Sequence, residues 1–305
     1  MKGILRSGFL ALVIMLSLAV PADAGPFEDG KAAYDRGDYA TALKFWRPLA
    51  ERGDAEAQHN LGVMYDNGQG VQQDYAEAAK WYHMAAEQGI ARAQHNLGHM
   101  YENGQGVPQD HADSVKWYRM AAEQGHANAQ SNLGFMYASG RGVQQNHAEA
   151  VKWYRMAAEQ GDAYAQYFLG VMYSTNRSVP QDDAEAVKWY RKAANQGFAY
   201  AQNNLGHMHE IGRGVQQDHA KAAAWYRKAA EQGFAPAQHN LGIMYADGAG
   251  VPRDDAAAYM WFTLATAQGF KEARKARDIV VKLMTHGQID EGRLIAREWM
   301  AEHQR

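Results

Sequence analysis

The strongest constraint on this chain is a nine-residue motif that returns every 36 residues. It first runs from Ala57 to Tyr65, as Ala-Gln-His-Asn-Leu-Gly-Val-Met-Tyr, and it recurs without insertion or deletion. A fixed period of this size predicts a solenoid, in which each unit packs only on its neighbours. We expect six full units, at residues 54–89, 90–125, 126–161, 162–197, 198–233 and 234–269.

The motif itself predicts the first helix of each unit. Ala57, Leu61, Met64 and Tyr65 are spaced so that they share one face of an α-helix. Gly62 lies beside that face, although a glycine inside a helix costs about 1 kcal/mol relative to alanine. Every unit keeps this glycine, so we expect a partner helix to approach closely there, where a Cβ atom would block it.

The second helix of each unit is bounded by turn and capping residues. The loop Gly-x-Gly-Val, first seen from Gly68, permits positive φ where the first helix ends. Asp74 then occupies an N-cap position that Asp or Asn fills in every unit, and Gly89 ends the helix. Trp81 recurs at the unit spacing and is interpreted as a core residue. These features predict an all-α solenoid of helix pairs.

The two ends of the array differ from its middle. Residues 25–53 match a shortened unit and are expected to cap the N-terminal end, and residues 270–305 are expected to form a C-terminal helical cap. The fourth unit also departs from the pattern. Asn176 and Ser178 replace the two loop glycines, so we expect an altered loop, and Phe168 replaces the usual Asn.

Residues 1–24 have the features of a signal peptide. Lys2 and Arg6 precede an apolar run from Gly8 to Val20, and Ala22-Asp23-Ala24 fits the cleavage rule, with cleavage expected after Ala24. The apolar run is short for a membrane span, so we expect no span after cleavage. The mature protein is predicted to be periplasmic or secreted. The chain contains no cysteine, so no disulfide supports the fold in that oxidising compartment.

Composition and motifs argue against several functional classes. The net charge is −3 and no basic patch is present, which disfavours nucleic acid as a partner. No Ser-x-x-Lys, Gly-x-Ser-x-Gly or Walker motif occurs, so we expect no enzyme and no cofactor. His95 and His99 have the spacing of a metal-binding pair, but no further ligand completes a site, so we expect no metal.

The repeated pattern resembles the Sel1-like repeat family. The residues that carry the resemblance are Ala-x-x-x-Leu-Gly-x-x-Tyr, Gly-x-Gly-Val and Ala-x-x-Trp-Tyr-x-x-Ala-Ala-x-x-Gly, and they cover residues 54–269. The family is an α/α solenoid related to tetratricopeptide repeats. The resemblance implies a right-handed superhelix of antiparallel helix pairs. It also implies an adaptor that binds other proteins, often in bacterial envelope assembly, signalling or host contact.

Candidate binding residues lie on the first helices, at positions that vary between units. Such positions are not dictated by stacking, and in a solenoid the first helices usually line the concave surface. The middle of this surface is rich in aromatic residues, which are enriched at interface hot spots, and its histidines could make binding sensitive to pH. The predicted partner-binding residues are His59, Val63, Arg92, His95, His99, Ser131, Phe135, Tyr164, Tyr167, Val171, Tyr200, Asn203, His207 and His239.

The favoured hypothesis is a non-enzymatic, exported adaptor whose concave face holds a peptide or a helix of a protein partner. Two alternatives stay open at this point. One is a secreted factor that contacts host proteins, and the other is a cell-wall-directed hydrolase or glycan binder.

Overall fold

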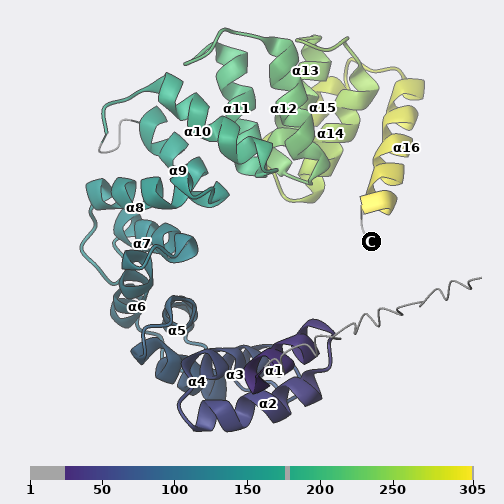
Figure 1. The fold of residues 1–305 in the computed structure, drawn as a ribbon. Helices are drawn as coiled ribbons and strands as arrows, with labels where there is room; N and C mark the ends of the chain where they lie inside the picture. The colour runs from purple at the N-terminus through teal and green to yellow at the C-terminus, as the bar shows by residue number, and fades with distance from the viewer. Residues whose placement is uncertain (1–24, 176–178, 304–305) are drawn as a thin grey trace, which may run out of the picture.

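A computed structural model describes residues 25–175 and 179–303. The predicted signal peptide and the substituted loop at Asn176 and Ser178 lie outside these residues. The described chain forms sixteen α-helices without a strand and curves into an open arc, with α1 and α16 on either side of the opening (Figure 1). The all-α solenoid predicted from the period is confirmed.

The helices alternate between two roles. The first helices of the six units are α3 (Ala55–Asn67), α5 (Ala91–Asn103), α7 (Ala127–Ser139), α9 (Ala163–Ser174), α11 (Ala199–Ile211) and α13 (Ala235–Asp247). The second helices are α4 (Tyr75–Glu87), α6 (His111–Glu123), α8 (His147–Glu159), α10 (Asp183–Asn195), α12 (His219–Glu231) and α14 (Asp255–Ala267). The ends are α1 (Pro26–Asp35), α2 (Tyr39–Glu51), α15 (Lys271–Val280) and α16 (His286–His303).

First helices of adjacent units approach one another, as α7 and α9 do, in addition to packing on the second helices. Helices on the inside of a curved stack lie closer together than those on the outside. The first helices therefore form the inner surface of the arc, where the sequence placed the candidate binding residues.

The glycine inside each first helix lies against a ring of the second helix. A Cβ atom on Gly62 would sit 2.6 Å from Cδ1 of Tyr82, and one on Gly98 would sit 2.7 Å from Cδ1 of Tyr118. In the sixth unit Phe262 takes the place of the tyrosine against Gly242. The predicted close approach is confirmed, and the ring is what requires the glycine.

A buried glutamine joins each unit to the one before it. Gln130 Nε2 donates to the carbonyl oxygen of Ala122, at 3.1 Å, in the preceding second helix. Its Oε1 accepts from Nε2 of Gln160, at 2.7 Å, in its own unit. All six units repeat both bonds. Because both ends of the amide are paired, a polar side chain is stable in the core.

The predicted boundary residues have the expected roles. Gly68 has a φ of 67° and ends α3 in the left-handed conformation. Asp74 accepts hydrogen bonds from the backbone amides of Ala76 and Glu77 at the start of α4. The tryptophan of the second helix is buried in four units, with Trp117 only 5% exposed, whereas Trp81 and Trp225 are half-buried.

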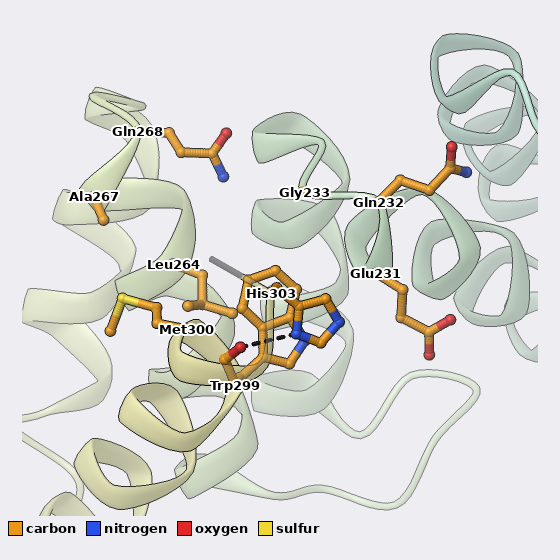
Figure 2. A pocket seen from close by; sticks show the side chains of 9 residues that line it. All are labelled: Glu231, Gln232, Gly233, Leu264, Ala267, Gln268, Trp299, Met300 and His303. Carbon is orange, nitrogen blue, oxygen red and sulfur yellow. Dashed lines mark hydrogen bonds between the residues drawn. The ribbon is translucent and has the colours of Figure 1, made fainter. Parts of the chain in front are cut away.

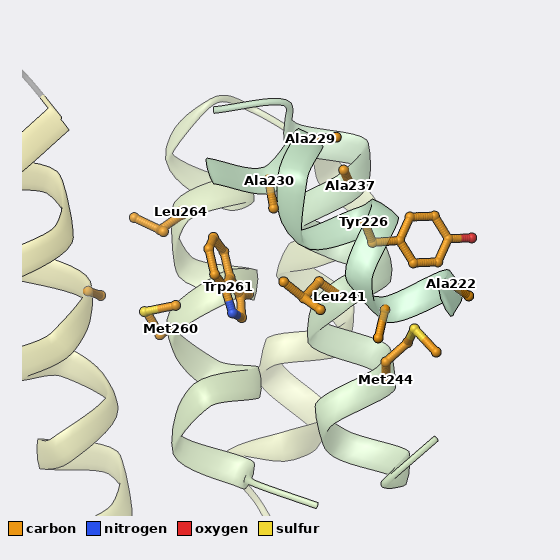
Figure 3. Close-up of a cluster of buried hydrophobic side chains, with 12 residues drawn as sticks. Ala222, Tyr226, Ala229, Ala230, Ala237, Leu241, Met244, Met260, Trp261 and Leu264 are labelled. Carbon is orange, nitrogen blue, oxygen red and sulfur yellow. The ribbon is translucent and has the colours of Figure 1, made fainter. Parts of the chain in front are cut away.

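The C-terminal cap ends the stack because its first helix lacks the pairing residues. Counted by the 36-residue period, Arg277 stands where earlier units have the leucine and Asp278 where they have the glycine. Helix α16 packs on α14 instead, where Gly292 lies against Tyr259 and the Trp299 ring is 6.1 Å from that of Trp261. Figure 3 shows Trp261 within the cluster that this cap helps to cover.

No helix in the described part of the chain combines the length and the apolar character needed to cross a membrane.

We predict that Gly98→Ala destabilises the protein although alanine favours helix. The new Cβ would lie 2.7 Å from the Tyr118 ring, and overpacking of this kind costs about 1–3 kcal/mol. Urea unfolding followed by circular dichroism measures the loss. Gly287→Ala is the matched control, because that helical glycine has no atom within 4 Å of its Cβ position and should tolerate alanine. Equal stability of the two variants would contradict the role given to the ring.

Candidate functional site

The inner surface carries the fourteen residues predicted to bind a partner. Five are exposed, namely Arg92, His99, Tyr164, Tyr200 and His207. Seven are half-buried, namely Val63, His95, Phe135, Tyr167, Val171, Asn203 and His239. His59 and Ser131 are buried, with 6% and 3% of their surface exposed, so the prediction that they face a partner directly needs correction.

Ser131 is covered by the N-cap residue of the next first helix. Ser131 Oγ donates to Oδ1 of Asp162 at 3.0 Å. In the same way Phe198 covers Tyr167, with ring centroids 5.3 Å apart. This N-cap row is not among the predicted binding residues, although its residues vary between units as strongly as the predicted positions on the first helices. They are Ile90, His126, Asp162, Phe198, Phe234 and Phe270.

Six aromatic side chains from α9, α11 and the residues that cap α11 and α13 form one continuous row, here called the aromatic row. Its members are Phe168, Tyr164, Tyr167, Phe198, Tyr200 and Phe234. Neighbouring centroids are 4.5 Å apart for Tyr164 and Phe168, 5.8 Å for Tyr167 and Tyr200, and 4.5 Å for Tyr200 and Phe234. Tyr200 is 52% exposed and Tyr164 36% exposed. The row therefore presents aromatic surface to solvent.

Aromatic–aromatic contacts stabilise the row itself. Its tilted rings have the offset geometry that such pairs prefer. Burial is the main cause that raises the pKa of Tyr164 to about 12, so its hydroxyl is neutral at physiological pH. The sequence predicted Tyr164, Tyr167 and Tyr200 as site residues, but not the three phenylalanines of the row.

In the first three units these positions are polar apart from Ile90, and we call Glu56, His59, Arg92, His95 and His126 the polar sector. Arg92 Nη2 forms an ion pair with Oε2 of Glu56 at 2.7 Å, across two adjacent units. The imidazoles of His95 and His126 stack with centroids 4.9 Å apart. The inner surface is therefore divided into a polar half and an aromatic half.

The hydrogen bonds of His95 fit a neutral imidazole. Asn132 Nδ2 donates to Nε2 of His95 at 3.2 Å, and His95 Nδ1 lies 3.3 Å from the Asn96 carbonyl oxygen Oδ1. Burial, with the neighbouring His126, lowers the pKa of His95 to about 4. Burial also lowers the pKa values of His59 and His126, and Arg92 contributes to both.

Two cavities lie at the ends of the array. One of about 550 Å³ borders the polar sector and is lined by Phe27, Tyr34 and Arg92 among others. The other, of about 540 Å³, lies between α12, α14 and α16 (Figure 2). There Trp299 stacks on His303, with centroids 3.9 Å apart. The second cavity is formed by second helices and the cap, so it is not part of the inner surface.

Within the described residues, no three His, Cys, Asp or Glu side chains are grouped so that they could hold a metal ion. His95 and His99 lie one turn apart on α5, with His95 half-buried and His99 exposed.

Six consecutive segments match the family model described as Sel1 repeat. They are residues 55–90, 91–126, 127–162, 163–198, 199–234 and 235–270. The chain belongs to the Sel1 repeat family. Sel1 repeats are in general a non-enzymatic scaffold that mediates protein interactions.

Solved Sel1 repeat structures are similar to this chain. A Sel1 repeat protein from Oxalobacter formigenes is 34% identical, with a TM-score of 0.73 over 80% of this chain and 97% of that one. A protective antigen with this fold, present in uropathogenic Escherichia coli strains, is 28% identical, with a TM-score of 0.51 over 90% and 91%. The search of curated proteins gave no match.

We predict that His95 makes the stability of this Sel1 repeat protein fall in acid. Its pKa is about 4 in the folded state against an ordinary value of 6.5, so between these limits the unfolded state takes up the proton more readily. Each pH unit in that window costs about 1.4 kcal/mol. His95→Asn, which copies Asn203 at the same position of the fifth unit, should reduce the slope.

Urea unfolding at intervals from pH 8 to pH 4 measures this effect. Above the ordinary pKa no difference in slope between the two proteins is expected, which provides the internal control. An unchanged slope in His95→Asn below pH 6 would show that His95 is not the group responsible.

Proposed function

We propose that this Sel1 repeat protein is a non-enzymatic adaptor that holds a peptide or a helix of a partner protein on its inner surface. The observation that supports this proposal most is the aromatic row. Tyrosine and tryptophan dominate binding energy at protein interfaces, because large rings bury much surface with little loss of conformational entropy. A solvent-exposed run of aromatic side chains on a concave scaffold fits such an interface.

The division of the inner surface gives the proposed partner an orientation. Where the aromatic half has Tyr164 and Tyr200, the polar half has Glu56 and Arg92. A segment lying along the arc would place its apolar residues on α9 and α11 and its polar residues on α3 and α5. We expect the partner segment to be apolar at one end and polar at the other.

Carboxylates on the inner surface take part in structural contacts, which agrees with a non-enzymatic role. Asp162 caps α9 by accepting from the amide of Ala165 at 2.7 Å. Glu102 accepts from the hydroxyl of Tyr118 at 2.8 Å, and Glu56 is paired with Arg92. These carboxylates are engaged in structural contacts.

The proposal includes export. It rests on the sequence of residues 1–24, with cleavage after Ala24 and a periplasmic or secreted product. Fractionation of the producing cells and mass measurement of the mature chain test it. A full-length chain in the cytoplasm would contradict it.

Contact with host proteins is a second candidate role. The similarity to the protective antigen of uropathogenic Escherichia coli favours it. Recovery of the protein outside the cell, rather than in the periplasm, would support this role over one in the envelope.

We predict that Tyr200→Glu abolishes capture of the partner without unfolding the protein. Tyr200 is 52% exposed, so the substitution leaves the core intact and places a charge in the aromatic row. Cross-linking in intact cells, followed by quantitative recovery of cross-linked proteins, should show at least a tenfold loss. Met120→Glu is the control, because Met120 is exposed to 36% on the second helix α6. Equal recovery from the two variants would refute binding at the aromatic row.

A further inference from the structure

The cavity between α12, α14 and α16 lies outside the inner surface and has no part in the proposed adaptor function. Its volume of about 540 Å³ is within the range of small-molecule sites in proteins. The cavity has a third wall because α16 packs directly on α14. Among the described helices, no two second helices of adjacent units pack on each other to that extent. The C-terminal cap therefore creates a concave site on the outer side of the array (Figure 2).

One wall of this cavity is apolar and aromatic. Leu264 on α14 and Met300 on α16 border the cavity, together with the indole of Trp299. Trp299 is half-buried, and its ring centroid lies 6.1 Å from that of Trp261 in the core. Such a wall fits the alkyl stem of a ligand, because methylene groups gain free energy when they leave water.

A second wall is rich in negative charge and hydrogen-bond acceptors. Helices α12 and α14 both end at the cavity, and the last carbonyl groups of a helix carry partial negative charge. The carboxylate of Glu231 adds a full charge and forms no ion pair within the described residues. The side-chain amides of Gln232 and Gln268 also border the cavity, but both already donate to glutamines of the array. This wall therefore favours a cation.

The lysine one turn before Glu231 does not supply that cation. The ammonium of Lys228 lies over the ring of Trp225 instead, 4.3 Å from its centroid. Lys192 lies over Trp189 in the same way, at 4.2 Å. The second helices of this protein thus already place an ammonium on an indole ring, which is an attractive arrangement for a cation.

The sixth unit lacks this lysine. Counted by the 36-residue period, Leu264 stands where the fourth and fifth units have Lys192 and Lys228. Leu264 borders the cavity, and the cap supplies a further indole there, that of Trp299. The cavity therefore lies beside the position from which the preceding two units extend an ammonium, and it offers both a ring and a carboxylate.

His303 lies next to Trp299 at the edge of the cavity. Its Nδ1 donates to the carbonyl oxygen of Trp299 at 2.8 Å, and the two rings stack with centroids 3.9 Å apart. This bond leaves Nε2 of a neutral imidazole as an acceptor. His303 is exposed in the last turn of α16, so its ring can also rotate away from the indole, a motion that is fast in exposed side chains.

We propose that this cavity binds a primary ammonium group carried on an apolar stem. The ammonium pairs with Glu231 and donates to carbonyl groups at the ends of α12 and α14. The stem packs on Leu264, Met300 and Trp299. An ammonium has three donors and no acceptor, which matches a wall of acceptors. A lysine side chain and a free alkyl diamine share this chemistry, and the inference goes beyond the adaptor function because the site is separate from the inner surface.

The test uses three small ligands and the purified protein. The first is lysine with an acetylated amino group and an amidated carboxyl group, so that only its side chain is charged. The second is norleucine blocked in the same way, which keeps the four-carbon stem and lacks the ammonium. The third is 1,5-diaminopentane. NMR titration of the 15N-labelled protein measures the affinities, and the indole N–H signal of Trp299, assigned with Trp299→Phe, locates the binding.

Blocked lysine is expected to bind at least tenfold more tightly than blocked norleucine and to shift the Trp299 signal. Tighter binding of the lysine compound than of the diamine assigns the site to a lysine of a peptide, and equal or weaker binding assigns it to free amines. Equal affinities for blocked lysine and blocked norleucine would overturn the proposal. The same holds for no binding of any ligand at millimolar concentration, or for binding that leaves the Trp299 signal unchanged.

A charge-removing variant tests the ion pair. Glu231→Gln should lower the affinity for blocked lysine at least tenfold and leave the Tm unchanged, because Glu231 is exposed. Glu123→Gln is the matched control, since Glu123 ends α6 at the same repeat position, away from the cap. It should change neither the affinity nor the Tm. An affinity of Glu231→Gln equal to that of the control would rule out the ion pair.

A variant on the inner surface separates this site from the adaptor function. Tyr200→Glu should leave the binding of blocked lysine unchanged, and a loss of binding there would overturn the assignment to the cavity. If Tyr200→Glu abolishes partner capture in cells and blocked lysine does not bind, the adaptor function stands and the ammonium site does not. If blocked lysine binds and Tyr200→Glu leaves capture unchanged, the ammonium site stands alone.

Discussion

The fold depends on one contact, the seating of an aromatic ring on a glycine inside the neighbouring helix. This contact fixes the distance between the helices of each pair, since a single added carbon at Gly62 or Gly98 would lie under 3 Å from the ring. It also aims the ring between first helices, so that a hydroxyl from the second helix reaches the inner surface. The same ring contact therefore pairs the two helices of a unit and places a polar hydroxyl at the inner surface.

Stacking of units relies on a second contact that water cannot easily replace. The buried glutamine connects the carbonyl of one unit to the side-chain amide of the next, and its bond to the carbonyl is protected from solvent. Apolar packing alone is tolerant of sliding, whereas a buried amide requires its partners in place. The glutamines therefore fix the register between units, and the rows on the inner surface follow from that register.

Much of this architecture could be predicted from the sequence. The repeated motif predicts six helix pairs, and the roles of Gly62, Gly68 and Asp74 follow from the physics of glycine and of helix caps. These predictions succeed because each depends on neighbours within one unit.

Contacts between units explain what the sequence did not reveal. Gln58 has a polar side chain of a type that is mostly exposed in proteins, yet it is 1% exposed because its hydrogen-bond partners lie in other helices. Ser131 is buried because a residue of the next unit covers it. The Tyr154 hydroxyl is buried without a hydrogen-bond partner among the described residues, and Ala138 stands where other first helices supply an acceptor for this tyrosine.

The C-terminal cap has a consequence for how such a protein changes length. Arg277 and Asp278 stand where the earlier units have the leucine and the glycine, and α16 packs on α14. The stop signal is thus separate from the units that it follows. Whole units could be gained or lost by recombination without a change in the C-terminal cap. Each such event would change the separation of the polar half and the aromatic half by one unit.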